Sequence, residues 1–210
     1  MRQFDYTKKW KKMLTPEIVR YLTTIHEYKG EQRLIAERYA DVLESLVEVA
    51  KIQSTESSNK IEGVYTSDER LKKIVLDKTM PKTRNEREIA GYRDVLGTIH
   101  ENFSHIPVRD TFILQLHRDL YKFENASSNG GKFKSTDNII EEEDVKGNKF
   151  VRFKPLSAWE TPEAIIELCD AYNGAINRSE ADALLIVPMF IIDFCVFIRL
   201  MTGMEELADC

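Results

Sequence analysis

Hydrophobic and polar residues follow the period of amphipathic helices along most of this 210-residue chain. Apolar positions three and four residues apart recur in residues 15–30, 31–53, 67–77, 82–103 and 108–123. Thr-Pro-Glu occurs at 15–17 and again at 161–163, and it combines a capping threonine, a proline suited to the first helical position and an acid suited to the helix start. We expect Gly30 to end the first helix.

The periodicity changes after residue 124. Two β-rich runs, 138–140 and 149–153, flank the polar segment 141–148, which predicts a hairpin with a polar tip. The apolar segment 183–201 approaches the length of a membrane span, but Pro188, Asp193 and Arg199 interrupt it, so we expect a buried core helix from about residue 180. The predicted fold class is all-α with one small β-hairpin.

Composition favours an ordinary globular protein. The chain is 42% hydrophobic and 31% charged, and its net charge of −5 gives no electrostatic case for binding nucleic acid or a membrane. The basic start lacks the apolar run of a signal peptide. Cys169, Cys195 and Cys210 lack the spacing of metal ligands and suit a reducing compartment, with Cys169 as a small core residue. These features predict a cytoplasmic protein without a metal site.

The segment "SSNKIEG", residues 57–63, leaves two interpretations open. Local rules favour a frayed helix end with a cap, an exposed acid and a terminating glycine. However, Ser58 and Glu62 are four residues apart and share one helical face. A carboxylate at a helix C-terminus is unfavourable by up to about 1 kcal/mol, and an arginine opposite it would offset that cost.

Ser58-x-x-x-Glu62-Gly63 resembles the inhibitory motif [S/T]-x-x-x-E-[G/N] of Fic-family proteins, in its N-terminal form. The similarity extends over roughly residues 30–194. Four further segments carry it: "EREIAGYRDVL" at 86–96, "FILQLHRDLY" at 112–121, "GGKFK" at 130–134 and "PLSAWETPEAIIELCDAY" at 155–172. The resemblance implies a Fic-type helical core with a hairpin flap.

The family transfers AMP from ATP to a hydroxyl side chain of a target protein, or to one of its own. Its signature, H-P-F-x-[D/E]-G-N-[G/K]-R, supplies a histidine base, an acid that holds Mg²⁺, and arginines and a helix start that bind phosphates. The resemblance implies that Glu62 inhibits transfer by pairing with the last arginine, while Ser58 fixes the turn that Gly63 ends. It also implies that Ile139 and Ile140 lie on the flap that docks the target chain by strand addition. ATP and Mg²⁺ are the cofactors expected of an intact member.

The signature itself is missing where the family would have it. After Phe194 the chain continues "CVFIRLMTGMEELADC", and none of the four histidines (His26, His100, His105 and His117) precedes Pro-Phe. We interpret His117, within a predicted helix, as structural. Back-translation of residues 197–206 in the neighbouring phase permits CAT CCG TTT AAT GAC GGG AAT GGA AGA. These codons spell His-Pro-Phe-Asn-Asp-Gly-Asn-Gly-Arg, which indicates that one base was lost near the Phe194 codon.

A lost base predicts three parts in this chain. Residues 1–104 would be a helical region with an inhibitory helix at about 55–63, residues 105–194 a C-terminally truncated Fic core with the flap at 130–154, and residues 195–210 an out-of-frame tail. The chain would contain no catalytic residue and would bind neither ATP nor Mg²⁺ productively. The apolar residues left without partners would lower solubility; they are Phe190, Ile191, Phe194 and Phe197. A genuine mutation, a pseudogene and a sequencing error all remain open as its source.

The function predicted from the resemblance is an adenylyltransferase autoinhibited through Glu62 and inactive in this chain. The alternative is a non-enzymatic, antitoxin-like helical regulator that presents Glu62 to a separate Fic protein. A generic helical scaffold would explain neither "SSNKIEG" nor the flap.

Overall fold

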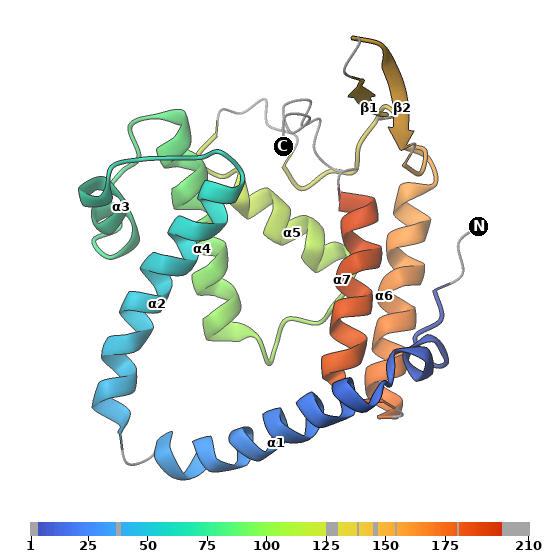
Figure 1. The fold of residues 1–210 in the computed structure, drawn as a ribbon. Coiled ribbons are helices and arrows are strands. Elements are labelled where there is room, and N and C mark those ends of the chain that lie inside the picture. The colour runs from blue at the N-terminus through green and yellow to red at the C-terminus, as the bar shows by residue number, and fades with distance from the viewer. Residues whose placement is uncertain are drawn as a thin grey trace. The chain divides into compact units, whose positions relative to one another are not determined.

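The computed structural model describes residues 4–36, 39–124, 130–137, 139–144, 147–153, 155–179 and 181–198. In these residues the chain forms one 3₁₀ helix, seven α-helices and a two-stranded antiparallel sheet (Figure 1). The elements are η1 (Lys9–Met13), α1 (Pro16–Ala36), α2 (Ala40–Ile61), α3 (Asp68–Val75), α4 (Arg84–Asn102), α5 (Asp110–Leu120), β1 (Ile140–Glu143), β2 (Lys149–Phe153), α6 (Thr161–Arg178) and α7 (Ala183–Ile198). A mostly helical fold with one small hairpin is therefore confirmed.

Several helix starts follow from local capping. The Thr15 side chain accepts a hydrogen bond from the Ile18 N–H at 3.2 Å, as predicted for the start of α1. Ser67 and Thr83 cap α3 and α4 in the same way. At the second Thr-Pro-Glu, however, Thr161 is already helical and Glu160 is the N-cap residue. The predicted start of α6 is therefore one residue late.

The prediction that Gly30 ends the first helix is wrong, because α1 continues through Gly30 to Ala36. A glycine inside a helix costs only about 1 kcal/mol relative to alanine, and the good helix formers around it offset that cost. The second predicted helix, 31–53, is accordingly divided between α1 and α2, and α2 runs on to Ile61. The predicted inhibitory helix at about 55–63 forms the last turns of α2.

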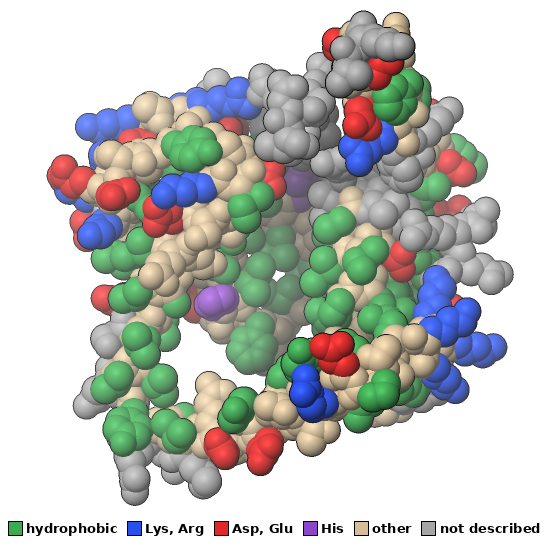
Figure 2. All heavy atoms as spheres, in the orientation of Figure 1, with side chains coloured by type: hydrophobic (Ala, Val, Ile, Leu, Met, Phe, Trp, Pro, Cys, Tyr) green, Lys and Arg blue, Asp and Glu red, His purple; other side chains and the backbone are tan. Residues whose placement is uncertain are grey.

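Apolar side chains are exposed along α1 and α2 (Figure 2). Each of the following is at least 47% exposed: Val19, Tyr21, Ile25, Tyr28, Ile35, Val42, Leu46 and Val47. The apolar stripe that predicts α1 therefore makes a helix whose apolar positions remain largely exposed. The helical period of these residues correctly predicts a helix, but it does not show which element would bury the apolar face.

The helices divide between two compact units. One unit comprises Met1–Leu14, Pro107–Gln115 and Gly131–Cys210, and the other comprises Thr15–Ile106 and Leu116–Gly130. The chain passes between the units after Leu14, Ile106, Gln115 and Gly130, and the predicted division into residues 1–104, 105–194 and 195–210 stays a prediction.

The core of the first unit forms where α6 and α7 pack together with the N-terminal segment. Its buried members are Tyr6, Ile165, Leu168, Cys169, Ala175, Ile186 and Met189. The Tyr6 hydroxyl donates to the buried Asp193 carboxylate at 2.8 Å, so the polar residue inside the apolar α7 is satisfied. Cys169 is 2% exposed and burial raises its thiol pKa to about 11, which confirms it as a core residue.

The core of the second unit forms between α2, α3 and α4. Its buried members are Leu71, Ile74, Val75, Ile89 and Ala90. At Gly91 the end of α5 approaches α4 so closely that a Cβ atom would lie 1.9 Å from the Leu120 carbonyl oxygen. A glycine is therefore required for α4 and the last residues of α5 to pack at this distance.

The apolar patch predicted on α7 is only partly present. Ile191 is 49% exposed and its neighbour Ile192 is 62% exposed. Phe190 and Phe194, in contrast, pack against the first core and stack on each other with centroids 5.5 Å apart. The expectation that both phenylalanines lose their partners is therefore wrong, and the Phe197 side chain lies outside the described residues. Among the described helices, none combines the length and hydropathy needed to cross a bilayer.

The hairpin is confirmed, with a different first strand. Ile140 pairs with Phe153 and Glu143 pairs with Lys149, so the three glutamates predicted for the polar tip belong to β1. Their side chains are exposed, and Arg152 lies 3.3 Å from the Glu142 carboxylate across the pair. An exposed two-stranded sheet has no buried face to exclude charged residues, which is why the acidic run does not stop the strand.

Candidate functional site

The end of α2 is a well-formed Schellman turn. The N–H of Gly63 donates to the Lys60 carbonyl at 3.1 Å, and the N–H of Val64 donates to the Asn59 carbonyl at 2.9 Å. Gly63 has φ +73°, a left-handed conformation that suits glycine. Glu62 is the last residue before it, at the C-cap. The prediction that Gly63 ends the helix directly after Glu62 is confirmed.

Two side chains hold the last turns of α2 in place. The Tyr92 hydroxyl, from α4, donates to Ser58 Oγ at 2.9 Å. The buried Asn59 donates through its side-chain amide to the Thr55 carbonyl at 2.8 Å. Val64 then packs against the second core. Ser58 therefore anchors the turn that carries Glu62, which fits the role expected of it, and its place in inhibition remains a prediction.

The Glu62 carboxylate is exposed and has no hydrogen-bond or ion-pair partner among the described residues. The nearest cation in sequence, Lys60, pairs instead with Glu56 one turn earlier, and this hydrogen bond raises the Lys60 pKa. The preceding Ile61 is 76% exposed. The turn thus presents a carboxylate that no described residue pairs with, from a fixed backbone position and beside an exposed apolar residue.

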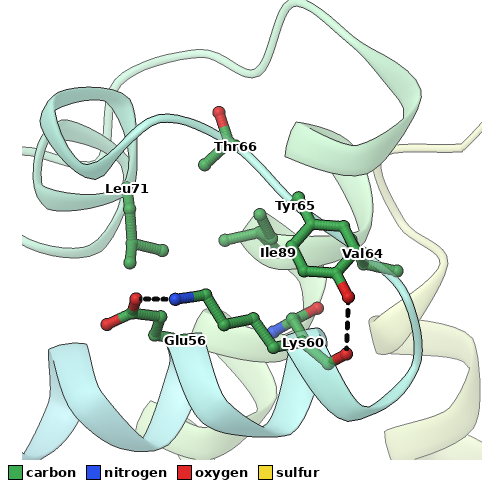
Figure 3. Close-up of a pocket in the computed structure, with 8 residues that line it drawn as sticks. Glu56, Lys60, Val64, Tyr65, Thr66, Leu71 and Ile89 are labelled. Atoms are coloured by element: carbon green, nitrogen blue, oxygen red, sulfur yellow. Dashed lines mark hydrogen bonds and ion pairs between the residues drawn. The ribbon is translucent and has the colours of Figure 1, made fainter.

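A small cavity lies behind the same turn (Figure 3). Its walls include Val64, Thr66, Leu71 and Ile89, and the Tyr65 hydroxyl donates to the Lys60 carbonyl at 3.4 Å across it. The cavity has a volume of about 10 Å³, which is room for a single water molecule. A nucleotide does not fit there, so the chemistry of the turn is that of its exposed carboxylate.

An ion pair that the sequence analysis did not predict joins α3 to the start of α4. Glu86, at the start of α4, accepts hydrogen bonds from Arg70 Nε at 2.8 Å, Arg70 Nη2 at 2.7 Å and the Lys82 N–H at 2.6 Å. The hydrogen bond from Arg70 is the main cause that lowers the Glu86 pKa from 4.5 to about 2, against the opposing effect of burial. The Thr-x-x-Glu pattern of a capping box at 83–86 was the available signal.

The two predicted flap residues lie at the start of β1. Ile140 is the first residue of the strand, and Ile139 precedes it with 52% of its surface exposed. Phe150 and Val151 on β2 are similarly exposed, at 49% and 54%. Because the sheet has only two strands, β1 has a free edge among the described residues. Ser58, Glu62 and Gly63 come together in one turn, whereas Ile139 and Ile140 belong to the other unit.

Among the described residues, no three histidine, cysteine, aspartate or glutamate side chains gather to hold a metal ion. His117 lies on α5 with its ring edge-on to Tyr121, and burial lowers its pKa. The chain matches no model of a known protein family, and the search of curated proteins finds no relative. The candidate site is therefore argued from the chain's own residues.

Proposed function

We propose that this chain belongs to the lineage of Fic-type protein adenylyltransferases and that Glu62 is the residue that restrains AMP transfer. The observation that carries the proposal is the exposed Glu62 carboxylate at the C-cap of α2, which has no partner among the described residues. The motif resemblance of Ser58, Glu62 and Gly63 supplies the assignment, and the geometry of the turn supports it.

The proposed restraint is a charge-assisted pair. A carboxylate receives a guanidinium through two parallel hydrogen bonds, which are stronger and more directional than neutral ones. An arginine held in this way is unavailable to the terminal phosphates of ATP. Gly63, Val64 and the Ser58–Tyr92 bond fix the backbone at Glu62, so little backbone conformational entropy is lost when the pair forms.

The hairpin supports the second half of the proposal. Its free strand edge and the exposed Ile139 suit the docking of an extended target segment by main-chain hydrogen bonds. In this proposal the hairpin presents a serine, threonine or tyrosine hydroxyl of a target protein, or of the same protein, for modification.

The catalytic signature is proposed to lie in the neighbouring phase of the gene. The nine codons that spell it overlap residues 197–206, and of these only Phe197 and Ile198 fall within the described residues, at the end of α7. The described residues offer no site for ATP and Mg²⁺ beside the Glu62 turn, so no catalytic step is assigned to the chain as translated. The transfer activity proposed here is that of the frame-restored protein.

The test is transfer of AMP from α-labelled ATP by protein whose frame has been restored by one base near the Phe194 codon. The restored protein with Glu62 is expected to label itself weakly, and Glu62→Gly is expected to raise labelling by at least about tenfold, the loss of one charge-assisted pair. Asp77→Gly is the matched control, because Asp77 is another exposed acid directly after a helix. Full activity with Glu62 in place, unchanged in Glu62→Gly, would overturn the inhibitory assignment.

A second candidate function uses the same exposed carboxylate. Because Glu62 has no partner among the described residues, it is open to a guanidinium of a separate protein, as a regulator acting in trans would require. Adding the unaltered chain to a frame-restored Glu62→Gly protein distinguishes the two. Suppression of labelling that is lost with Glu62→Gly in the added chain favours the regulator, and no suppression favours autoinhibition.

A further inference from the structure

A large cavity in the second unit is separate from the Glu62 turn. It has a volume of about 370 Å³, in the range of small-molecule sites. Its wall comes from α2, from the end of α3 and the segment that follows, from α4, and from the segment after α5. The apolar part of the wall comes from Val75 and Leu96. The cavity therefore has both the size and the mixed lining that a small organic ligand requires.

The charged side chains of the wall are mainly basic. Four of them are cations (Lys51, Lys78, Arg93 and Lys122) and two are carboxylates (Asp94 and Glu101). Asp94 is already neutralised, since it accepts from Arg93 Nε at 2.6 Å and lies 2.5 Å from Lys122 Nζ. Lys51 and Lys78 have no carboxylate partner within the described part of the chain. The charged side chains of the wall therefore carry a net charge of +2, and two of its ammonium groups have no carboxylate partner among the described residues.

Arg93 adds a buried guanidinium to the same wall. Its side chain is only 10% exposed, its Nη1 donates to the Ile74 carbonyl at 2.6 Å, and its Nη2 has no hydrogen-bond acceptor among the described residues. A fork fixed in this way is pre-organised to donate to an anion oxygen.

Two further features suggest that the wall is shaped for a ligand. Lys78 has φ +49°, a left-handed conformation unusual for a residue with a Cβ atom, and it lines the cavity in that conformation. The Thr55 hydroxyl, in a side chain that is 1% exposed, has no hydrogen-bond partner among the described residues. Rotation about its Cα–Cβ bond would offer this hydroxyl to an acceptor in the cavity.

We propose that this cavity binds a small phosphate monoester. A monoester carries nearly two negative charges at neutral pH, which match the net charge of +2 on the cavity wall, and its oxygens accept from Arg93 and Thr55. The cavity is several times larger than a phosphate group, so its apolar wall is left for the organic part. The site is independent of the proposed transfer activity.

Isothermal titration calorimetry of the full chain tests the proposal, with glycerol 3-phosphate, inorganic phosphate, succinate and glycerol as probes. Glycerol 3-phosphate is expected to bind with a Kd of about 1 mM or tighter, and the other three at least about tenfold more weakly. Equal binding of succinate would overturn the assignment of a phosphate site. Equal binding of inorganic phosphate would overturn the claim that the apolar wall contacts the organic part of the ligand.

Two variants locate the site. Lys51→Ala and Lys78→Gly should each raise the Kd for glycerol 3-phosphate about tenfold, the loss of one charge-assisted contact. Alanine suits the interior of α2 and glycine suits φ +49°, so both variants should fold, which circular dichroism checks. Lys72→Ala, an exposed lysine of α3 outside the cavity, is the matched control. No saturable binding, or binding that both variants leave unchanged, would overturn the proposal.

Discussion

The Tyr92 hydroxyl donates to Ser58 Oγ at 2.9 Å and thereby joins the middle of α4 to the last turns of α2. The bond lies one helical turn before Glu62, so it restrains the position from which the exposed carboxylate is presented. A residue 34 positions away in sequence thus helps to fix the candidate site.

Replacing Tyr92 by phenylalanine removes this bond and nothing else. Tyr92→Phe is expected to lower the free energy of unfolding by about 0.5–1.5 kcal/mol, measured by urea denaturation. Tyr65→Phe is the control, because Tyr65 is 57% exposed and its hydroxyl lies 3.4 Å from the Lys60 carbonyl that accepts from it. Loss of this long hydrogen bond should cost less than about 0.5 kcal/mol. Equal effects of the two variants would show that the Ser58 bond does not stabilise the turn.

Gly63 and Gly30 should respond to alanine in opposite directions. Gly63→Ala forces a Cβ atom into φ +73° and is expected to cost about 1–2 kcal/mol. Gly30 lies inside α1 with open space around its Cα, so Gly30→Ala should stabilise the protein by about 0.5–1 kcal/mol. Both are read from thermal unfolding. Destabilisation by Gly30→Ala would mean that the helix does end there.

Glu86 should make stability depend on acid pH. Its folded-state pKa is about 2, below the ordinary 4.5, so its contribution is complete above pH 4.5 and is lost as the pH falls towards 2. The shift corresponds to about 3 kcal/mol at neutral pH. The free energy of unfolding of the wild type, measured by urea denaturation, should therefore fall between pH 4.5 and pH 2. That of Glu86→Gln should fall much less over the same interval.

Glu69 provides the control for Glu86. It pairs with Lys73 on the exposed surface of α3, where solvent screens the interaction. Glu69→Gln should leave the acid profile of the wild type nearly unchanged. A profile for Glu86→Gln that parallels the wild type down to pH 2 would contradict the assigned ion pair with Arg70.

The buried hydroxyl of Thr55 destabilises the ligand-free chain, because it is desolvated and no described residue hydrogen-bonds to it. Thr55→Val keeps the shape of the side chain and is expected to raise the free energy of unfolding by about 1 kcal/mol in phosphate-free buffer. Thr98→Val, which loses a hydrogen bond to the Asp94 carbonyl at 2.9 Å, should instead lower it slightly. A loss of more than about 1 kcal/mol in Thr55→Val would show that the hydroxyl is satisfied.

Features set by neighbours in sequence could be predicted. The cap at Thr15 and the stop at Gly63 depend on hydrogen bonds within a few residues, and the second strand of the hairpin follows from its β-rich run. The extension of α1 through Gly30 could not be predicted from local rules, because terminating and interior glycines look alike in sequence.

Features set by packing were not predictable in the same way. Arg70 and Glu86 are 16 positions apart, so they form their ion pair only after α3 has packed on α4. The cavity lined by Lys51 and Lys78 arises from segments separated along the chain, and periodicity alone does not show which cations will share a wall. The turn that carries Glu62 was predictable, while its anchor at Tyr92 required the structure.

The most direct measurement is the nucleotide sequence of the gene around the Phe194 codon. The account predicts that one added base near that codon brings the downstream bases into a phase that spells His-Pro-Phe-Asn-Asp-Gly-Asn-Gly-Arg without interruption. Bases that spell no such phosphate-binding loop in either neighbouring phase would contradict the proposed lineage.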